Sequence, residues 1–281
     1  MRPAQWTKNL LVFAAIIFSQ NFFNVIMLLK VVVAFFLFCI LSGSVYIIND
    51  LIDIEHDRRH PKKSKRPIAS GMLKSPFAAT TATVLVIISI VLSFFLNTSF
   101  GFVTSIYFLL QMAYSFWLRN IIILDVFAIS AGFVLRAIGG AEVISVPISS
   151  WLLICTTLLA LFLALSKRRH ELTLLGSDAS LHRKNLREYS NLLLDQMISV
   201  VTSSTVIAYA LYTLSSETVS KFKTDSLKYT IPFVLFGILR YLYLIYQRNE
   251  GGSPERILLT DKPLIINIIL YVLAVGLILY L

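Results

Sequence analysis

The chain has 281 residues, of which 57% are hydrophobic and only 14% charged, and its mean hydropathy is +0.78. A soluble domain of this length carries roughly a quarter charged residues, so the composition excludes water as the main solvent of the fold. The formal charge of +10 is spread over several loops beside apolar segments, which argues against nucleic-acid binding and for contact with lipid headgroups.

Apolar segments long enough to cross about 30 Å of hydrocarbon recur along the whole chain. Because a bilayer offers the backbone no water, each segment must be a helix or belong to a closed β-barrel, and the alternating polarity of barrel strands is absent. We therefore predict an all-α, polytopic membrane bundle of nine transmembrane helices that forms one integral membrane domain, residues 1–281. The predicted spans are residues 10–27, 30–48, 78–96, 101–118, 121–141, 149–166, 197–215, 229–246 and 264–281.

Two features of the first spans complete this prediction. The apolar run after Asn9 has no small-residue cleavage site, so we expect no signal peptide and a first helix that is retained. Cys39 and Cys155 each lie inside an apolar segment, where a thiol behaves as a small buried hydrophobe.

Orientation follows from the Lys and Arg residues of the loops. If the N-terminus is cytoplasmic, one side of the membrane carries 19 of the 25 Lys and Arg residues, and the other side carries only Lys30, Lys221, Lys223 and Lys228. The positive-inside rule then predicts a multi-pass protein of the cell (inner) membrane with a cytoplasmic N-terminus and an outer C-terminus. Eleven of the 15 acids fall on the same side. Acids do not follow the topology rule, so their asymmetry predicts a cytoplasmic active site.

The strongest functional signal is Asn49-Asp50-Leu51-Ile52-Asp53-Ile54-Glu55-His56-Asp57, at the end of the second span. On a continuous helix, Asn49, Asp53 and Asp57 form one stripe that Asp50 can join. Like charges on one face repel each other, so the stripe predicts a divalent cation that neutralises it. Oxygen donors suit Mg²⁺, which combines one or two carboxylates with water and substrate phosphate oxygens. We predict Asn49, Asp50, Asp53 and Asp57 as Mg²⁺ ligands, with a diphosphate as the bound group.

Two other interpretations of this segment remain open. The stripe is also typical of a solvated acidic helix end that resists entry into the membrane. His56 and His60 are four residues apart and could bind zinc beside the carboxylates, although no third histidine lies nearby in the sequence.

A basic loop follows, with Arg58, Arg59, Lys62, Lys63, Lys65 and Arg66 ahead of Pro67-Ile68-Ala69-Ser70-Gly71. Pro and Gly bracket a turn, which would let the loop fold back toward the acidic stripe. Such a loop beside a magnesium site suits a highly phosphorylated substrate. Anchoring to anionic lipid headgroups is the alternative for any single lysine of this loop.

A second basic cluster, Lys167-Arg168-Arg169-His170-Glu171, ends the sixth span on the predicted cytoplasmic side. Arginine presents a rigid donor fork to phosphate and lysine a point charge, so this mixed cluster could hold a terminal monophosphate. Anchoring of the span by the positive-inside rule is the alternative.

Ionisable residues also occur within the spans, where they usually face a cavity or a partner. Asp125 is shallow enough to reach the cytoplasmic site, whereas Arg136 lies about 16 Å further along the same helix axis. We expect structural pairing or cavity lining for Arg136 and for Arg240. Asp261 and Lys262 precede the last span, where they either close the site or cap the helix.

The Asn-Asp-x-x-Asp-x-x-x-Asp pattern after the second of nine spans, followed by Arg-Pro-Ile-Ala-Ser-Gly, resembles the UbiA prenyltransferase superfamily over nearly the whole chain. The resemblance implies a helical bundle around a central cavity, with magnesium and a diphosphate held near the cytoplasmic surface by two acidic motifs. It implies that Asn49, Asp53 and Asp57 are metal or diphosphate ligands. Where the second acidic motif is expected, this chain instead carries its basic cluster at Lys167, which favours a second, metal-free phosphate.

Together with the opening Arg2-Pro3-x-Gln5-Trp6-x-Lys8-Asn9 and the run Leu135-Arg136-Ala137-Ile138, that cluster resembles the decaprenyl-phosphate phosphoribosyltransferase branch. This implies 5-phosphoribosyl diphosphate as donor, a polyprenyl phosphate as acceptor, and release of diphosphate. The product would feed arabinose-donor synthesis for cell envelopes.

The chemistry of the residues agrees with that reaction. Mg²⁺ would neutralise the departing diphosphate while an oxocarbenium-like C1 forms, which makes Asp50, Asp53 and Asp57 the predicted catalytic residues. The acceptor phosphate is already anionic, so no strong general base is needed. The predicted substrate-binding residues are Lys8, Asn49, Lys65, Arg66, Lys167, Arg168, Arg169, Glu171, Asp261 and Lys262.

Two alternatives use the same features differently. A true prenyltransferase would attach a polyprenyl chain to an aromatic or other small acceptor with the same aspartates. A transporter would use intramembrane Arg136 and Arg240 as part of a pathway, although no inverted repeat is evident in the sequence.

Overall fold

The computed structural model describes residues 3–59, 63–175, 186, 188–252 and 254–280, and every regular element within these ranges is a helix. The prediction of an all-α chain is confirmed. By density of contacts the chain divides into two compact units, Met1–Arg119 with Leu135–Pro147, and Asn120–Val134 with Ile148–Leu281. The prediction of one domain stays a prediction.

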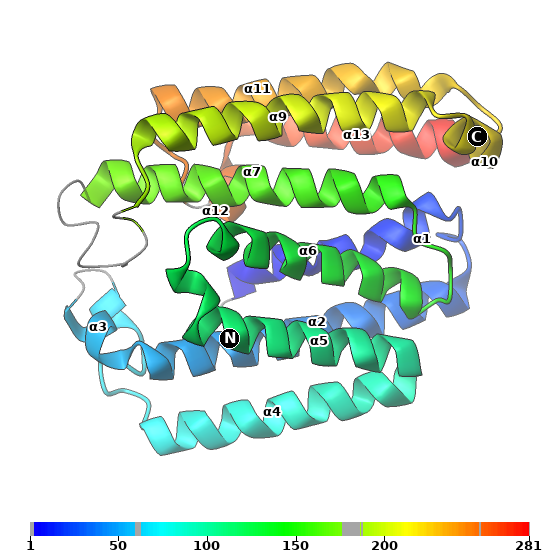
Figure 1. The fold of residues 1–281 in the computed structure, drawn as a ribbon. Helices are drawn as coiled ribbons and strands as arrows, with labels where there is room; N and C mark the ends of the chain where they lie inside the picture. Colours follow the sequence, from blue (N-terminus) through cyan, green and yellow to red (C-terminus); the bar gives the residue numbers. More distant parts are fainter. Residues whose placement is uncertain (1–2, 60–62, 176–185, 187, 253, 281) are drawn as a thin grey trace. The chain divides into compact units, whose positions relative to one another are not determined.

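Unit 1 is built around a long second helix. Its elements are η1 (Pro3–Phe13), α1 (Ala14–Phe18), α2 (Val25–Ile52), α3 (Ile54–Arg59), η2 (Lys63–Lys65), α4 (Ser75–Leu96), α5 (Thr98–Phe116) and the last part of α6 (Leu124–Glu142). Helices α2, α4 and α5 pack side by side (Figure 1). Asparagine side chains start two of them, because Asn24 accepts a hydrogen bond from Met27 N and Asn97 accepts one from Phe100 N.

Unit 2 contains the first part of α6 and the rest of the chain. Its further elements are α7 (Ser150–Leu175), α9 (Asn191–Leu214), α10 (Ser216–Phe222), η6 (Ser226–Thr230), α11 (Ile231–Gln247), α12 (Pro254–Thr260) and α13 (Lys262–Tyr280). Helix α9 packs against α7 and α11, and α11 packs against α13. A short helix η3 (Leu118–Asn120) lies where the chain passes from unit 1 to unit 2.

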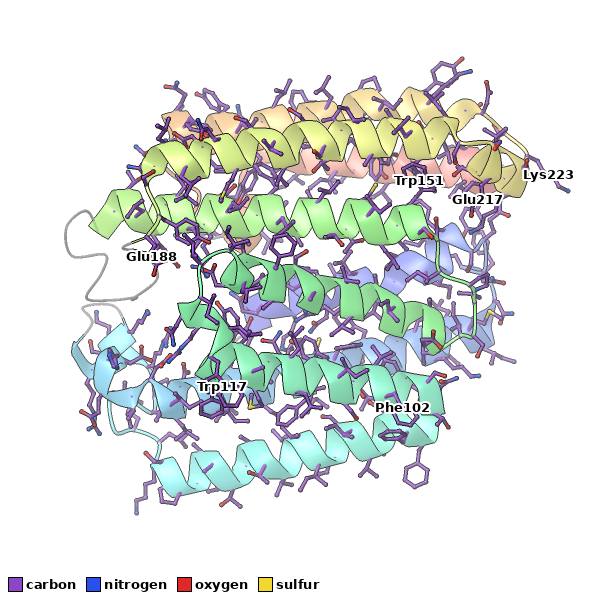
Figure 2. The ribbon with its side chains drawn as sticks, in the orientation of Figure 1. Phe102, Trp117, Trp151, Glu188, Glu217 and Lys223 are labelled. Atoms are coloured by element: carbon purple, nitrogen blue, oxygen red, sulfur yellow. The ribbon has the colours of Figure 1, made fainter. Side chains whose placement is uncertain are left out.

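Eight helical segments in the described ranges are long and apolar enough to cross a membrane: 25–52, 75–96, 98–116, 124–142, 150–174, 191–214, 226–247 and 262–280. Apolar side chains cover their outer faces: Phe102 on α5 is 59% exposed, and Trp117, directly after α5, is 68% exposed (Figure 2). In water such exposure would be unfavourable, whereas lipid accommodates it. The chain is therefore an integral, multi-pass membrane protein.

The boundaries predicted for the first two spans are wrong. Instead of a helix over 10–27, the chain forms a 3₁₀ helix, a short α-helix and a turn, and α2 already begins at Val25. A 3₁₀ helix rises about 2.0 Å per residue, so η1 and α1 together extend about 30 Å, close to the hydrocarbon thickness. Whether this segment is the ninth span stays a prediction, and so does the central cavity.

Close backbone contact holds η1 in unit 1. A Cβ at Gly140 of α6 would lie 2.0 Å from the Val12 carbonyl oxygen, so only glycine permits this approach. Asn9 is fully buried beside it and donates to Cys39 Sγ and to Ser42 Oγ, both at 3.2 Å. These contacts depend on tertiary packing and have no signature in the local hydrophobic pattern.

Candidate functional site

The acidic segment after α2 is not one continuous helix, which corrects the stripe predicted from spacing. Helix α2 ends at Ile52, Asp53 is its C-cap with φ −95° and ψ 13°, and α3 begins at Ile54. The hydrogen bonds across the break nevertheless keep helical spacing, because Asp53 N donates to Asn49 O and Asp57 N donates to Asp53 O. The backbone spacing of the three residues therefore stays helical across the break.

Arg66 neutralises two of the aspartates. Its Nη1 donates to Asp50 Oδ1 at 3.0 Å and to Asp57 Oδ2 at 2.5 Å, and Asp57 is only 2% exposed. The turn after it brings Arg66 there, with Ser70 N bonded to Arg66 O and Gly71 in the left-handed region at φ +80°. The prediction that the basic loop folds back onto the acidic segment is confirmed for Arg66.

Arg119 neutralises the third aspartate, although its place in the sequence does not single it out. From η3, its Nη1 donates to both carboxylate oxygens of Asp53, at 2.9 and 3.0 Å. Ser115 Oγ, at the end of α5, donates to Asn49 Oδ1. Only the packing of α5 against α2 reveals these two partners, because 66 residues separate each from its contact.

The oxygen donors of this segment fit a divalent cation that is bound together with a phosphorylated ligand. In the described ranges no three acidic, histidine or cysteine side chains form a ready-made metal cluster. Asn49 and the aspartates are hard oxygen donors, and Mg²⁺ commonly takes only one or two carboxylates and completes its shell with water and substrate phosphates. The segment therefore fits a cation that arrives together with a phosphorylated ligand. We call Asn49, Asp50, Asp53, Asp57, Arg66 and Arg119 the acidic cluster.

Other candidates in unit 1 lie at the surface or outside the described ranges. Lys65 and His56 are exposed, and Lys8 in η1 is half-buried. His60 lies outside the described residues, so the zinc hypothesis is not tested. The binding roles of Lys8 and Lys65 stay predictions.

In unit 2, Arg168 forms a buried ion-pair network. It is 1% exposed, its Nε donates to Asp125 Oδ2 at 2.8 Å, and its Nη1 pairs with Glu171. Tyr189 Oη donates to the other Asp125 oxygen at 2.9 Å and accepts a hydrogen bond from Ile123 N. Burial raises the pKa of Tyr189 to about 12, so it remains a donor at neutral pH.

Arg169 and Lys167 flank that network. Arg169 Nε donates to Asp195 Oδ1 at 2.5 Å, and its guanidinium lies 4.2 Å from the ring centroid of Tyr246, whose hydroxyl also donates to Asp195. Lys167 is half-buried. The carboxylates of Asp125, Glu171 and Asp195 thus neutralise the positive charges of Arg168 and Arg169. The number of charged residues in the sequence does not show this pairing. We call Lys167, Arg168, Arg169 and Glu171 the basic cluster, and their substrate-binding roles stay predictions.

Asp261 acts as a helix cap, one of the two alternatives that the sequence left open. Its Oδ1 accepts from Leu264 N at 3.0 Å at the start of α13, and both carboxylate oxygens accept from Arg240, at 3.1 and 2.8 Å. The hydrogen bond from Arg240 lowers the pKa of Asp261. The structural pairing predicted for Arg240 is confirmed. Lys262 is exposed, and its role and that of Asp261 in substrate binding stay predictions.

Arg136 is likewise paired inside unit 1. It is 5% exposed, its Nε donates to Asn9 Oδ1 at 2.6 Å, and its Nη2 donates to Tyr107 Oη at 2.8 Å. These bonds join η1, α5 and α6, so the structural role predicted for Arg136 is confirmed.

Comparison with known proteins places the chain in a family and agrees with the helical fold. Residues 10–259 match the model of the UbiA prenyltransferase family. The chain is 34% identical to the decaprenyl-phosphate phosphoribosyltransferase of Mycolicibacterium smegmatis, over the whole chain and 91% of that protein. It is 32% identical to the Corynebacterium glutamicum enzyme of the same name, over the whole chain and 85% of that protein. A UbiA homologue from Archaeoglobus fulgidus, solved with GPP and Mg²⁺, shares the fold with a TM-score of 0.75 at 18% identity, covering 100% and 98% of the two chains.

Proposed function

Since the chain belongs to the UbiA prenyltransferase family, we propose that it transfers 5-phosphoribose from 5-phosphoribosyl diphosphate to a polyprenyl phosphate such as decaprenyl phosphate, and that diphosphate is released. The observation that carries the proposal is the end-to-end similarity to enzymes named decaprenyl-phosphate phosphoribosyltransferase. A glycosyl-type transfer also suits the charged residues of this chain. They can neutralise a leaving diphosphate, and the reaction needs no activated nucleophile from the protein.

The reaction exchanges one bond at the anomeric carbon of ribose. The bond from C1 to the diphosphate oxygen breaks, the diphosphate leaves with the electron pair, and an oxygen of the lipid phosphate forms a new bond to C1. The acceptor oxygen is already anionic, so no side chain has to remove a proton. Positive charge develops at C1 and negative charge on the leaving group, so the protein has to stabilise the leaving diphosphate.

The acidic cluster is proposed to hold the diphosphate end of the donor. Asn49, Asp50, Asp53 and Asp57 would hold a divalent cation, with Mg²⁺ the expected ion, and the cation would supply charge neutralisation for the leaving group. The UbiA homologues from Archaeoglobus fulgidus solved with GPP or DMAPP each contain Mg²⁺ as well, which supports this choice.

Arg66 and Arg119 are proposed to contact the same diphosphate. In the structure each guanidinium binds carboxylates of the acidic cluster, at 2.5 to 3.0 Å. Guanidinium forks bind phosphate oxygens with the same geometry that they use for carboxylates. When the cation and the diphosphate enter, both arginines can therefore exchange a carboxylate oxygen for a phosphate oxygen without leaving the cluster.

The basic cluster of unit 2 is proposed to bind a phosphate that carries no metal, either the 5-phosphate of the ribose or the phosphate of the lipid. Lys167 and Arg169 are the residues proposed to touch it. Arg168 is buried and bonded to Asp125, so its proposed contribution is to hold the neighbouring cations in position. Glu171 pairs with Arg168 and would act through it.

We further propose that these clusters lie on the cytoplasmic side of the inner membrane. The excess of Lys and Arg in the loops at those helix ends supports this orientation. The second candidate is a prenyltransferase that moves a polyprenyl chain from its diphosphate to a small acceptor. Membership of the UbiA prenyltransferase family supports this candidate.

A single incorporation assay separates the two candidates. Membranes containing the protein are incubated with Mg²⁺, ribose-labelled 5-phosphoribosyl diphosphate and decaprenyl phosphate, and lipid-extractable label is measured. We expect labelled lipid that depends on both substrates. In a parallel reaction with a labelled prenyl diphosphate and an aromatic acid, we expect no labelled prenylated acid. A labelled prenylated acid without labelled phosphoribosyl lipid would instead establish the second candidate.

A further inference from the structure

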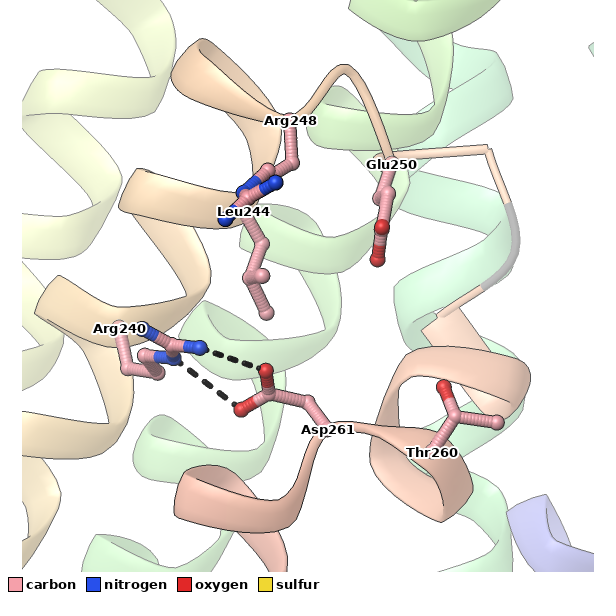
Figure 3. Close-up of a pocket in the computed structure, with 6 residues that line it drawn as sticks. All are labelled: Arg240, Leu244, Arg248, Glu250, Thr260 and Asp261. Carbon is pink, nitrogen blue, oxygen red and sulfur yellow. Dashed lines mark hydrogen bonds and ion pairs between the residues drawn. The ribbon is translucent and has the colours of Figure 1, made fainter.

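A pocket of about 330 Å³ opens in unit 2 where α11 ends and α13 begins. It is lined by Arg240, Leu244, Arg248, Glu250, Thr260 and Asp261 (Figure 3). Its volume lies within the range of small-ligand sites, which start near about 300 Å³. Apart from Asp261, none of these residues belongs to the predicted substrate-binding set.

One wall of the pocket is a stripe on α11. Arg240, Leu244 and Arg248 are spaced four residues apart and so lie on one helical face. Leu244 is 3% exposed and forms an apolar floor, while Arg240 is engaged by both oxygens of Asp261. Figure 3 shows this closed pair on one side of the pocket and the side chains of Arg248 and Glu250 on the other.

The turn after α11 fixes the second pair of charges. Asn249 has φ +54°, and the backbone N–H groups of Arg248 and Glu250 both donate to Leu244 O, at 3.2 and 3.1 Å. The left-handed Asn249 thus lies between two N–H groups that share one carbonyl at the helix end. Within the described part of the chain, no ion pair engages Arg248 or Glu250. The turn therefore offers one cation and one anion to a ligand.

The pocket lies at the depth of lipid headgroups, because it is formed where two membrane-spanning segments end. Tyr243 and Tyr246 of α11 are 40% and 37% exposed near that end, as expected of the aromatic residues that mark a membrane interface. Leu239 shares their face and is 55% exposed, so an apolar strip runs from the pocket's edge into the hydrocarbon region.

The charges of the pocket select the class of lipid. Arg240 and Asp261 are bonded to each other, so Arg248 and Glu250 are the charges left for a ligand. A purely anionic headgroup would meet the Glu250 carboxylate, and a purely cationic one would meet the Arg248 guanidinium. A headgroup that carries both charges satisfies both residues. We propose that the pocket binds a zwitterionic phospholipid with a primary ammonium, of the phosphatidylethanolamine type. Its phosphate contacts Arg248, its ammonium donates to Glu250, and its acyl chains follow Leu239 and Tyr243.

Lipid binding to the purified protein tests this proposal directly and needs no transferase activity. The protein in detergent is mixed with phosphatidylethanolamine, phosphatidylcholine or phosphatidylglycerol of identical acyl chains, and bound lipid is counted by native mass spectrometry. We expect phosphatidylethanolamine to bind about tenfold tighter than the other two, because choline has no N–H to donate and glycerol has no charge for Glu250. Equal retention of the three lipids would overturn the proposal.

Variants assign the contacts. Glu250→Gln should abolish the preference for ethanolamine over choline, and Arg248→Gln should weaken both lipids about tenfold. The exchange of both charges, Arg248→Glu with Glu250→Arg, should restore ethanolamine selectivity if the two groups act as a pair. Arg256→Gln on α12, an exposed arginine outside the pocket lining, is the matched control and should leave binding unchanged. Selectivity that survives in all pocket variants would place the lipid elsewhere.

Discussion

At the scale of single residues, the acidic cluster pairs every aspartate that spacing singled out with an arginine. Repulsion between like charges predicts a neutralising cation there, and Arg66 and Arg119 already relieve part of that repulsion. The carboxylates are thus held in place before any metal or substrate enters. The acidic cluster is therefore preorganised, and its dependence on each carboxylate can be measured.

Replacement of the buried aspartate tests the acidic cluster. Asp57→Asn keeps the shape of the side chain but removes the charge that binds Arg66 and the proposed cation, so we expect phosphoribosyl transfer to fall about a hundredfold or more. Glu55→Gln is the control two residues away, because Glu55 is exposed and pairs only with Arg58 among described residues. Near-normal turnover in purified, folded Asp57→Asn would contradict the metal assignment.

The pair of Asp261 and Arg240 predicts a pH dependence of stability. Because the folded pKa of Asp261 is lowered, its contribution is fully present above the unfolded pKa of about 3.9 and is lost as pH falls through the folded pKa. Thermal unfolding of wild type and Asp261→Asn in detergent should differ by a constant amount from pH 7 to 5, and the difference should shrink below about pH 4. A difference that stays constant down to pH 3 would show that the charge of Asp261 is not the stabilising element.

At the scale of secondary structure, the N-terminal segment departs most from expectation. Its apolar residues predict a helix, yet the hydrophobic pattern does not distinguish an α-helix from a 3₁₀ helix. Two contacts accompany the tighter form: Val12 lies against Gly140, and Asn9 accepts a hydrogen bond from Arg136. Its eleven residues exceed the three or four that are usual for 3₁₀ helices, so tertiary contacts have to stabilise it.

Gly140→Ala tests that packing. The added Cβ would meet Val12 O at 2.0 Å, so η1 or α6 must shift, and we expect a loss of about 1–3 kcal/mol and a lower melting temperature. Gly276→Ala in α13 is the matched control, since nothing lies within 4 Å of its added Cβ. There alanine should be neutral or raise stability by up to about 1 kcal/mol. Equal melting temperatures for the two variants would exclude a close contact at Gly140.

At the scale of the whole molecule, helix ends and loop charges together predict one orientation. Lys65 follows α2 and Lys221 lies on α10, in loops that alternation assigns to opposite sides of the membrane, and both are exposed. In intact cells a membrane-impermeant thiol reagent should label Lys221→Cys and should label Lys65→Cys only after permeabilisation. The reverse pattern would invert the proposed orientation.

Metal removal tests the proposed mechanism on the intact protein. Excess chelator should abolish transfer, and Mg²⁺ should restore it, while the melting temperature without substrate changes little because Arg66 and Arg119 already neutralise the aspartates. Undiminished transfer in chelator would refute a metal-dependent mechanism. A large fall in melting temperature would instead show that the cation belongs to the resting fold.

The sequence alone was enough to predict a helical membrane protein, because an apolar segment of about 20 residues spans the hydrocarbon layer and has to be helical there. It also located the acidic segment, the basic loop and the basic cluster, since charged residues stand out against apolar spans. Tertiary structure decided how those charges are balanced: Arg119 reaches Asp53 and Tyr189 reaches Asp125 across more than 60 residues. Such pairing depends on which helices pack together, and the period of a single helix carries no information about its neighbours.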